Sequence, residues 1–176
     1  MTTVNQRSSG IKGLHHNAYR CRDSEETRKF YDDFLGLPLA ATLEIHVTKT
    51  GRASHHLHTF YQLDDGSFLA FFEAPDMPFD FKEQHDFDLH IALEVSYEHM
   101  LTMKKKGEEL RMPVRGVSDH HFIDSIYFRE PNGYVIELTA PRPNHDEATD
   151  AAKNKARAKR DQWQRDKATS AQKENR

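Results

Sequence analysis

The sequence repeats itself, and this repeat constrains the fold more than any other feature. The segment Leu14–Ala18 aligns with Asp88–Ala92, and Tyr61–Pro75 aligns with Tyr127–Pro141 without a gap. Self-similarity over segments of this length is the signature of a duplicated structural unit. We therefore expect two copies of one module within the chain.

Each module is predicted to contain a strand, a helix and three further strands. Alternating apolar residues indicate the strands, and Asp23 followed by Glu26 is a capping-box pattern that opens the first helix. In the first module we expect a strand over 11–21, a helix over 25–34 and strands over 39–47, 56–63 and 67–73. In the second we expect a strand over 88–95, a helix over 96–106 and strands over 112–116, 122–129 and 134–140.

The domain organisation follows from the repeat and from a change in composition. Residues 1–143 are predicted to form one domain, with module one over 11–75 and module two over 88–141. Residues 144–176 are rich in Ala, Lys, Arg, Asp and Gln and predict a charged helical tail starting near Asp146. The predicted fold class is α+β, with paired βαβββ modules and a C-terminal helix.

Charge and hydropathy exclude several classes of function. Residues 1–141 hold 15 basic against 22 acidic side chains, which gives nucleic acid no basic footprint. The longest apolar runs, such as 68–72, have the length of a strand, so we expect no membrane span. The single cysteine, Cys21, agrees with a reducing compartment, and together these features predict a cytoplasmic protein.

Three residues in apolar, strand-like segments are candidate metal ligands. The repeat places His16 over His90, so the two imidazoles occupy equivalent positions in the two modules. Glu137 lies within the apolar run 134–138, where a buried carboxylate needs a cation or strong hydrogen-bond donors. Two histidines and one carboxylate are typical of non-haem Fe(II) sites with open coordination positions.

Residues 11–141 resemble the vicinal oxygen chelate superfamily, which includes glyoxalases, fosfomycin-modifying enzymes, bleomycin-binding proteins and extradiol dioxygenases. The segments that carry the resemblance are 14–23, 30–31 with 35–37, 90–92 and 127–138. The resemblance implies a curled mixed sheet around a metal cavity. It also implies that His16, His90 and Glu137 are the metal ligands.

The position of a fourth ligand separates the branches of this superfamily. Glyoxalases carry a second glutamate in the first module at the position that mirrors Glu137. The gapless repeat places Phe71 there, and alignment on the turn glycines places Ala70 there. Neither residue can bind a metal, and Glu73 would reach the site only through a β-bulge.

A longer motif favours the extradiol dioxygenase branch. The chain matches the signature of that branch from His120 through Tyr127 and 130–133 to Glu137, and departs from it only at Ser118. The resemblance implies that Tyr127 hydrogen-bonds a metal-bound substrate oxygen. It also implies that His120 lies in the second coordination shell. Ser67 occupies the place of the usual acid/base histidine, which leaves three other histidines as candidates for that role: His56, His58 and His85.

We therefore predict an enzyme that binds a small catechol-like molecule at a divalent metal, as a non-haem Fe(II) extradiol-type dioxygenase. Mn(II), Ni(II) and Zn(II) suit the same ligands. A glyoxalase-type lyase or isomerase is the alternative and requires Glu73 near the metal, while a metal-free ligand-binding protein ranks last. The paired modules form the site either within one chain or between two chains of a homodimer, and the sequence does not choose between these arrangements.

Overall fold

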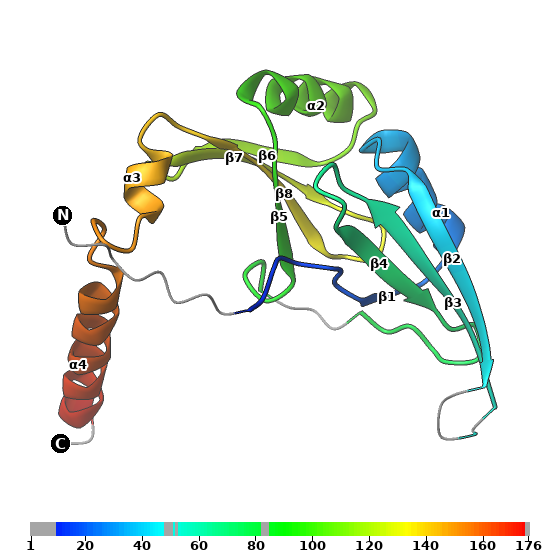
Figure 1. Cartoon of the computed structure of the whole chain (residues 1–176), viewed down its shortest axis with the longest axis horizontal. Helices are drawn as coiled ribbons and strands as arrows, with labels where there is room; N and C mark the ends of the chain where they lie inside the picture. Colours follow the sequence, from blue (N-terminus) through cyan, green and yellow to red (C-terminus); the bar gives the residue numbers. More distant parts are fainter. Residues whose placement is uncertain (1–9, 48–50, 52, 82–84, 175–176) are drawn as a thin grey trace. The chain divides into compact units, whose positions relative to one another are not determined.

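The structure is a computed structural model that describes residues 10–47, 51, 53–81 and 85–174 (Figure 1). The chain divides into two compact units, residues 1–90 with 129–135 and residues 91–128 with 136–176. The two four-stranded sheets have the orders β1-β4-β3-β2 and β5-β8-β7-β6. These two equivalent sheets, each accompanied by a helix, confirm the predicted α+β class with paired βαβββ modules.

The first unit follows the predicted order of elements. It contains β1 (Tyr19–Cys21), α1 (Ser24–Arg28), the π-helical turn η1 (Lys29–Phe34), β2 (Leu39–Val47), β3 (Ala53–Gln62) and β4 (Phe68–Glu73). Strand β1 pairs parallel to β4, and the other neighbours are antiparallel. The strand expected over 11–21 is shorter, because Ile11 and Leu14 are 80% and 65% exposed and its earlier part makes only an isolated bridge from His16 to Phe68.

The core of the first unit lies between the helical segment and one face of the sheet. Tyr31 of η1 is fully buried, with its ring centroid 4.7 Å from that of Phe71 and 5.4 Å from that of Tyr61. The Asp23 carboxylate caps α1 by accepting a hydrogen bond from the Glu26 N–H at 2.8 Å, as the capping pattern predicts. Large aromatic rings bury enough apolar surface to hold the helical segment on the sheet.

The turn 129–135, which belongs to the second module in sequence, packs within the first unit. Asn132 accepts a hydrogen bond from the Arg22 N–H at 2.8 Å and donates to the Thr27 hydroxyl at 3.2 Å. The same amide donates to Glu130 at 2.8 Å, and the Tyr134 hydroxyl donates to a backbone carbonyl at 2.6 Å. These buried polar contacts explain why the turn belongs to the first unit.

The second unit carries the equivalent elements. These are β5 (His90–Glu94), α2 (Tyr97–Glu109), β6 (Val114–Asp119), β7 (Ile123–Arg129) and β8 (Val135–Pro141), with the ends of several strands at the unit boundary. Helix α2 lies over one face of this sheet (Figure 1) and buries Met100 and Met103. Ser96 caps the helix by accepting from the His99 N–H at 3.1 Å.

The tail contains two helices where the sequence predicts one. They are α3 (His145–Thr149) and α4 (Ala156–Glu174). Asp150 leaves the helical conformation with φ −70° and ψ 111°, and Lys155 has a positive φ of 55°, so the chain turns between them. Among the described residues, no helix is both long and apolar enough to span a membrane.

Candidate functional site

The first sheet presents a face on the side away from its helical segment. Along β3, Tyr61 points toward Tyr31, whereas His58, three residues earlier, points to the opposite side of the sheet. The His58 ring stacks on Phe72 with centroids 3.7 Å apart and lies 4.2 Å from the ring of Phe60. We call this surface, formed by His58, Phe60, Phe68 and Phe72, the open face of the first sheet.

His16 lies at the open face. Its ring centroid is 5.5 Å from that of Phe60 and 6.0 Å from that of His58. Nδ1 of His16 lies 2.8 Å from Nδ1 of His15, so the neighbouring imidazoles share a hydrogen bond. Because Nδ1 is engaged by His15, Nε2 is the atom that His16 would offer to a metal. The structure therefore brings one predicted ligand together with one of the candidate acid/base histidines.

His58 is the most enclosed of these imidazoles. Its exposed fraction is 7%, and Nε2 is buried with no hydrogen-bond partner among the described residues. Burial lowers the pKa of His58, and the nearby His16 lowers it further. His58 is therefore a neutral imidazole near neutral pH.

The other two candidate acid/base histidines differ from His58 in setting. His56 lies on the same side of β3 and hydrogen-bonds the Ser54 hydroxyl through Nδ1. His85 is exposed, with its ring 4.3 Å from that of Phe87. Ser67, at the position of the usual acid/base histidine, donates its hydroxyl to Asp65 at 2.6 Å within the β3–β4 turn. Ser67 is thus a turn residue.

The structure distinguishes the residues considered for a fourth metal ligand. Phe71 points toward the helical segment and packs on Tyr31, whereas the adjacent Ala70 points to the open face. Glu73 shares the side of Phe71 and accepts a hydrogen bond from the Ser24 N–H at 2.9 Å, at the start of α1. The position on the open face therefore carries a methyl group, and the nearby glutamate is engaged on the other side of the sheet.

In the second unit, three residues of the predicted signature form one hydrogen-bonded chain. The Tyr127 hydroxyl on β7 donates to Oε1 of Glu137 on β8 at 3.1 Å. Nε2 of His120 lies 2.7 Å from the same hydroxyl. Because the tyrosine proton is directed to the carboxylate, the imidazole donates its own Nε2–H to the tyrosine oxygen.

The surrounding residues keep Tyr127 protonated and bury the carboxylate of Glu137. Glu137 has an exposed fraction of 6%, so its carboxylate is largely removed from water. Burial raises the pKa of Tyr127, and the charge of Glu137 raises it further. The Arg115 guanidinium carbon lies 4.9 Å from the centre of the Tyr127 ring and adds a cation–π contact. Tyr127 is therefore a hydrogen-bond donor at physiological pH.

His90, the remaining predicted ligand, is the first residue of β5. It is half-buried, and its Nδ1 lies 3.3 Å from the carbonyl oxygen of Asp86. Strand β5 is the neighbour of β8, the strand that carries Glu137. His16 and His90 belong to the first unit and Glu137 to the second.

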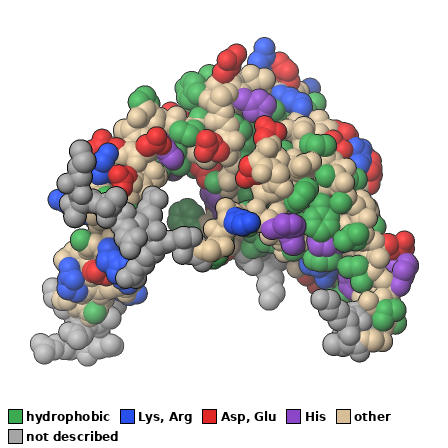
Figure 2. Space-filling model, viewed as in Figure 1, with side chains coloured by type: hydrophobic (Ala, Val, Ile, Leu, Met, Phe, Trp, Pro, Cys, Tyr) green, Lys and Arg blue, Asp and Glu red, His purple; other side chains and the backbone are tan. Residues whose placement is uncertain are grey.

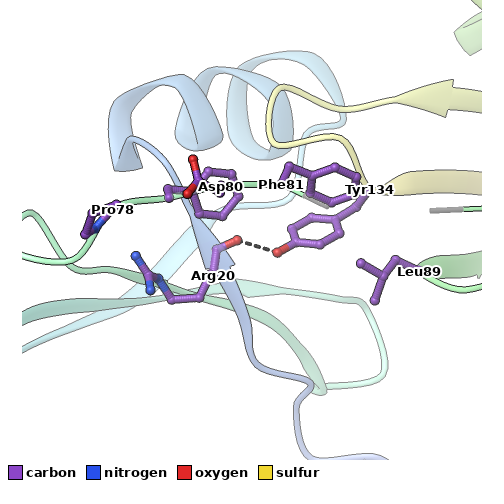
Figure 3. A pocket seen from close by; sticks show the side chains of 7 residues that line it. Arg20, Pro78, Asp80, Phe81, Leu89 and Tyr134 are labelled. Carbon is purple, nitrogen blue, oxygen red and sulfur yellow. Dashed lines mark hydrogen bonds between the residues drawn. The ribbon is translucent and has the colours of Figure 1, made fainter. Parts of the chain in front are cut away.

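A pocket that the sequence does not reveal lies in the first unit (Figure 3). It has a volume of about 220 Å³ and is lined by Arg20, Pro78, Phe79, Asp80, Phe81, Leu89 and Tyr134. Arg20 donates to the Met77 carbonyl at 2.9 Å, and its guanidinium carbon lies 5.8 Å from the centre of the Phe79 ring. Only folding brings these segments together. Their one signal in the sequence is that residues 74–87, between the two modules, are rich in Pro and Phe.

Comparisons with known proteins agree with this architecture. A family model described as the glyoxalase/bleomycin resistance protein/dioxygenase superfamily matches residues 13–138. A comparison with the curated proteins finds no match.

Among solved structures, three similar ones come from different sources. A glyoxylase/bleomycin resistance protein/dioxygenase domain from Frankia sp. EAN1pec has a TM-score of 0.62 at 15% identity, covering 77% of this chain and 96% of that one. FosX, a fosfomycin resistance protein from Listeria monocytogenes complexed with Mn(II) and sulfate, has a TM-score of 0.56 at 19% identity, covering 77% and 97%. An integron cassette protein from the mobile metagenome of Halifax Harbour sewage outfall has a TM-score of 0.52 at 23% identity, covering 74% and 99%. At these identities the likeness concerns the fold.

Proposed function

Because the chain belongs to the glyoxalase/bleomycin resistance protein/dioxygenase superfamily, we propose that it is a metal-dependent enzyme acting on a small molecule with two adjacent oxygens. More specifically, we propose a non-haem Fe(II) dioxygenase of the extradiol type with a catechol-like substrate. His16, His90 and Glu137 are the proposed metal ligands. The observation that carries the proposal is the hydrogen-bonded chain of His120, Tyr127 and Glu137.

The donor set fits a divalent metal. Two imidazoles and one carboxylate are ligands that Fe(II), Mn(II), Ni(II) and Zn(II) accept. Glu137 is a buried carboxylate, and a cation beside it would offset the cost of removing its charge from water. A carboxylate that binds a metal is commonly held by a hydrogen bond to its other side, and Tyr127 supplies such a donor. The Mn(II) complex of the FosX neighbour also supports a divalent ion.

When bound, the metal would act as a Lewis acid that lowers the pKa of a substrate hydroxyl and, as Fe(II), would supply electrons for the reduction of oxygen. Tyr127 keeps its proton, and by turning that proton from Glu137 to the substrate it would hydrogen-bond a substrate oxygen on which negative charge develops. His120 donates to the Tyr127 oxygen and fixes the orientation of that hydroxyl.

The open face of the first sheet offers a general base and an apolar surface for the substrate. Neutral His58 can accept a proton from a substrate hydroxyl, since general base catalysis needs an unprotonated group near neutral pH. The rings of Phe60, Phe68 and Phe72 provide an apolar surface on which an aromatic substrate can pack. His58 is thus our candidate for the role that Ser67 does not fill.

The glyoxalase-type alternative depends on Glu73. That interpretation needs a glutamate near the metal to move a proton on the substrate. Glu73 instead accepts a hydrogen bond from the Ser24 N–H at the start of α1. Ala70, at the equivalent position on the open face, has no ligand atom. We therefore rank the oxygenase above the isomerase.

The test combines metal analysis with two activity assays. Protein purified anaerobically should contain one equivalent of iron, and the Fe(II) form should consume oxygen with a panel of catechols. His90→Ala should lose the iron while staying folded, whereas the control His85→Ala, a nearby exposed histidine, should keep it. Full iron occupancy in His90→Ala would refute the ligand assignment. Hemithioacetal isomerisation by the Ni(II) or Zn(II) form without oxygen uptake, dependent on Glu73, would favour the glyoxalase alternative.

A further inference from the structure

The hairpin formed by β2 and β3 carries a second group of metal-ligating side chains, separate from the ligands proposed above. Its members are Glu44 and His46 on β2 and His55 on β3, and their ligand atoms all lie within 4.8 Å of one another. All three side chains are exposed, with fractions of 56%, 66% and 56%. We call this group the hairpin cluster.

The register of the two strands explains why these residues meet. Glu44 and His46 are two residues apart on one strand, so their side chains leave the same side of the sheet. The pairing of Ile45 with His56 places His55 across from His46, at the irregularity that separates Ile45 from Val47. The two imidazole rings are stacked, with centroids 5.7 Å apart and planes within 12°. Cross-strand pairing therefore aligns two imidazoles beside one carboxylate.

The hairpin cluster lies on the side of the sheet away from His16. His56 and His58 share the open face, and alternation along β3 directs His55 to the other side. Tyr61, which packs on Tyr31, lies on the same side as His55. The cluster is thus on the side of the sheet that faces the helical segment, at the exposed end of the hairpin.

The distances within the hairpin cluster fit metal coordination as well as long hydrogen bonds. Nε2 of His55 lies 3.4 Å and Nε2 of His46 lies 3.5 Å from the same Oε1 of Glu44. Both exceed the ordinary N–H···O range of about 2.7–3.2 Å. Two ligand atoms each about 2.0–2.1 Å from a tetrahedral zinc ion are separated by about 3.4 Å. The carboxylate oxygen therefore stands at coordination spacing from both imidazole nitrogens.

We infer that Glu44, His46 and His55 form a second binding site for a divalent transition metal ion of the Zn(II), Ni(II) or Cu(II) class. Imidazole and carboxylate ligands suit these ions, and a three-ligand set leaves a position for water or an external ligand. Figure 2 shows histidine and acidic side chains next to each other on the surface near the end of this hairpin. The exposed setting allows a metal to enter without opening the fold.

The experiment uses full-length protein carrying His90→Ala, which removes a ligand of the proposed catalytic metal. Titration calorimetry with Zn(II) should show one binding event in this background, and addition of Zn(II) should shift the imidazole NMR signals of His46 and His55. Adding His46→Ala or His55→Ala should weaken the binding at least tenfold. His99→Ala, an exposed histidine on α2, is the matched control and should leave the affinity within twofold.

The outcomes separate this inference from the proposed function. If His90→Ala protein does not bind Zn(II), or if His46→Ala and His55→Ala leave the affinity unchanged, the hairpin site is refuted. If wild-type protein binds one equivalent that His90→Ala leaves intact and His46→Ala removes, the hairpin site stands and the proposed catalytic ligands fail. His16→Ala serves as a second background should His90→Ala not fold.

Discussion

At the residue scale, the proposed chemistry depends on the single hydroxyl group of Tyr127. This hydroxyl connects His120 to Glu137 and keeps its proton, because burial and the charge of the carboxylate raise its pKa. The extradiol signature predicted that these three residues act together, and the second unit brings them into one hydrogen-bonded chain. Their role in catalysis is part of the proposal.

Replacing Tyr127 by phenylalanine removes the hydroxyl and leaves the ring. We expect turnover to fall by about tenfold to a thousandfold, as for the loss of one hydrogen bond formed in the transition state, while the iron content stays at one equivalent. Oxygen uptake and metal analysis of the same preparation measure the two quantities. Tyr97→Phe, at an exposed position on α2, is the control and should leave turnover unchanged. Unaltered turnover in Tyr127→Phe would remove the hydroxyl from the mechanism.

Glu130 is a buried carboxyl whose protonation is linked to stability. Burial raises its pKa to about 7, although the Tyr134 N–H and the Asn132 amide donate to it. The folded protein therefore binds this proton more tightly than the unfolded chain does. The resulting stabilisation is complete below the pKa of the unfolded chain and is lost as pH rises through about 7.

Glu130→Gln should remove this pH dependence. Between pH 4.5 and 8, we expect the free energy of unfolding of the wild type to fall relative to that of the variant, by on the order of 3 kcal/mol. Urea denaturation across this range measures the difference. Glu98→Gln, at an exposed position on α2, should run parallel to the wild type. A constant difference between wild type and Glu130→Gln at every pH would contradict a raised pKa.

At the element scale, the sequence predicted which segments form helices and strands better than how they end. The strand over 39–47 has the bounds of β2, and the helix expected over 25–34 became α1 followed by the π-helical turn η1. Hydrophobic alternation reports the buried side of an element, whereas its ends depend on which backbone groups find partners. The broken tail illustrates this point, since its residues favour helix throughout and only the turn at 150–155 separates α3 from α4.

Gly107 shows how one element depends on close packing. A Cβ atom at this position of α2 would lie 2.7 Å from Cε1 of Phe128 and 2.8 Å from Cγ2 of Val114. Gly107→Ala should therefore destabilise the protein by about 1–3 kcal/mol, reduced by up to about 1 kcal/mol through the better helix propensity of alanine. The midpoint of urea unfolding measures the change, with Lys105→Ala on the exposed side of α2 as the control. A variant as stable as the wild type would show that the helix shifts to make room.

At the scale of the whole molecule, the tail is separable from the residues proposed for catalysis. None of the proposed metal ligands lies beyond Pro143, and Trp163 on α4 is 68% exposed. Arg142 pairs with Asp119 at 2.9 Å and with Asp124 at 2.5 Å, and these residues precede the tail. The second sheet therefore keeps these ion pairs without α3 and α4.

A chain ending at Pro143 should keep its metal and its catechol-dependent oxygen uptake. We expect both within about twofold of the full-length protein, because the removed segment contributes no proposed ligand. Metal analysis and oxygen consumption provide the comparison, and sedimentation would reveal any change in oligomeric state. Loss of metal on truncation would mean that the tail covers the site or holds a dimer together.

The sequence by itself determined the duplicated module and the α+β class and supplied the candidate metal ligands, because repeats, alternation and motif spacing are local properties of the chain. It did not decide whether Ala70 or Phe71 occupies the position of the fourth ligand. It also did not decide which of His56, His58 and His85 is the acid/base histidine. The tertiary structure directed Phe71 and Glu73 toward the helical segment, and placed His58 beside His16. It also aligned Glu44, His46 and His55 across two strands. These outcomes depend on which side of the sheet a residue faces and on which strand lies next to it. Both are decided by the pairing of segments that are distant in the sequence.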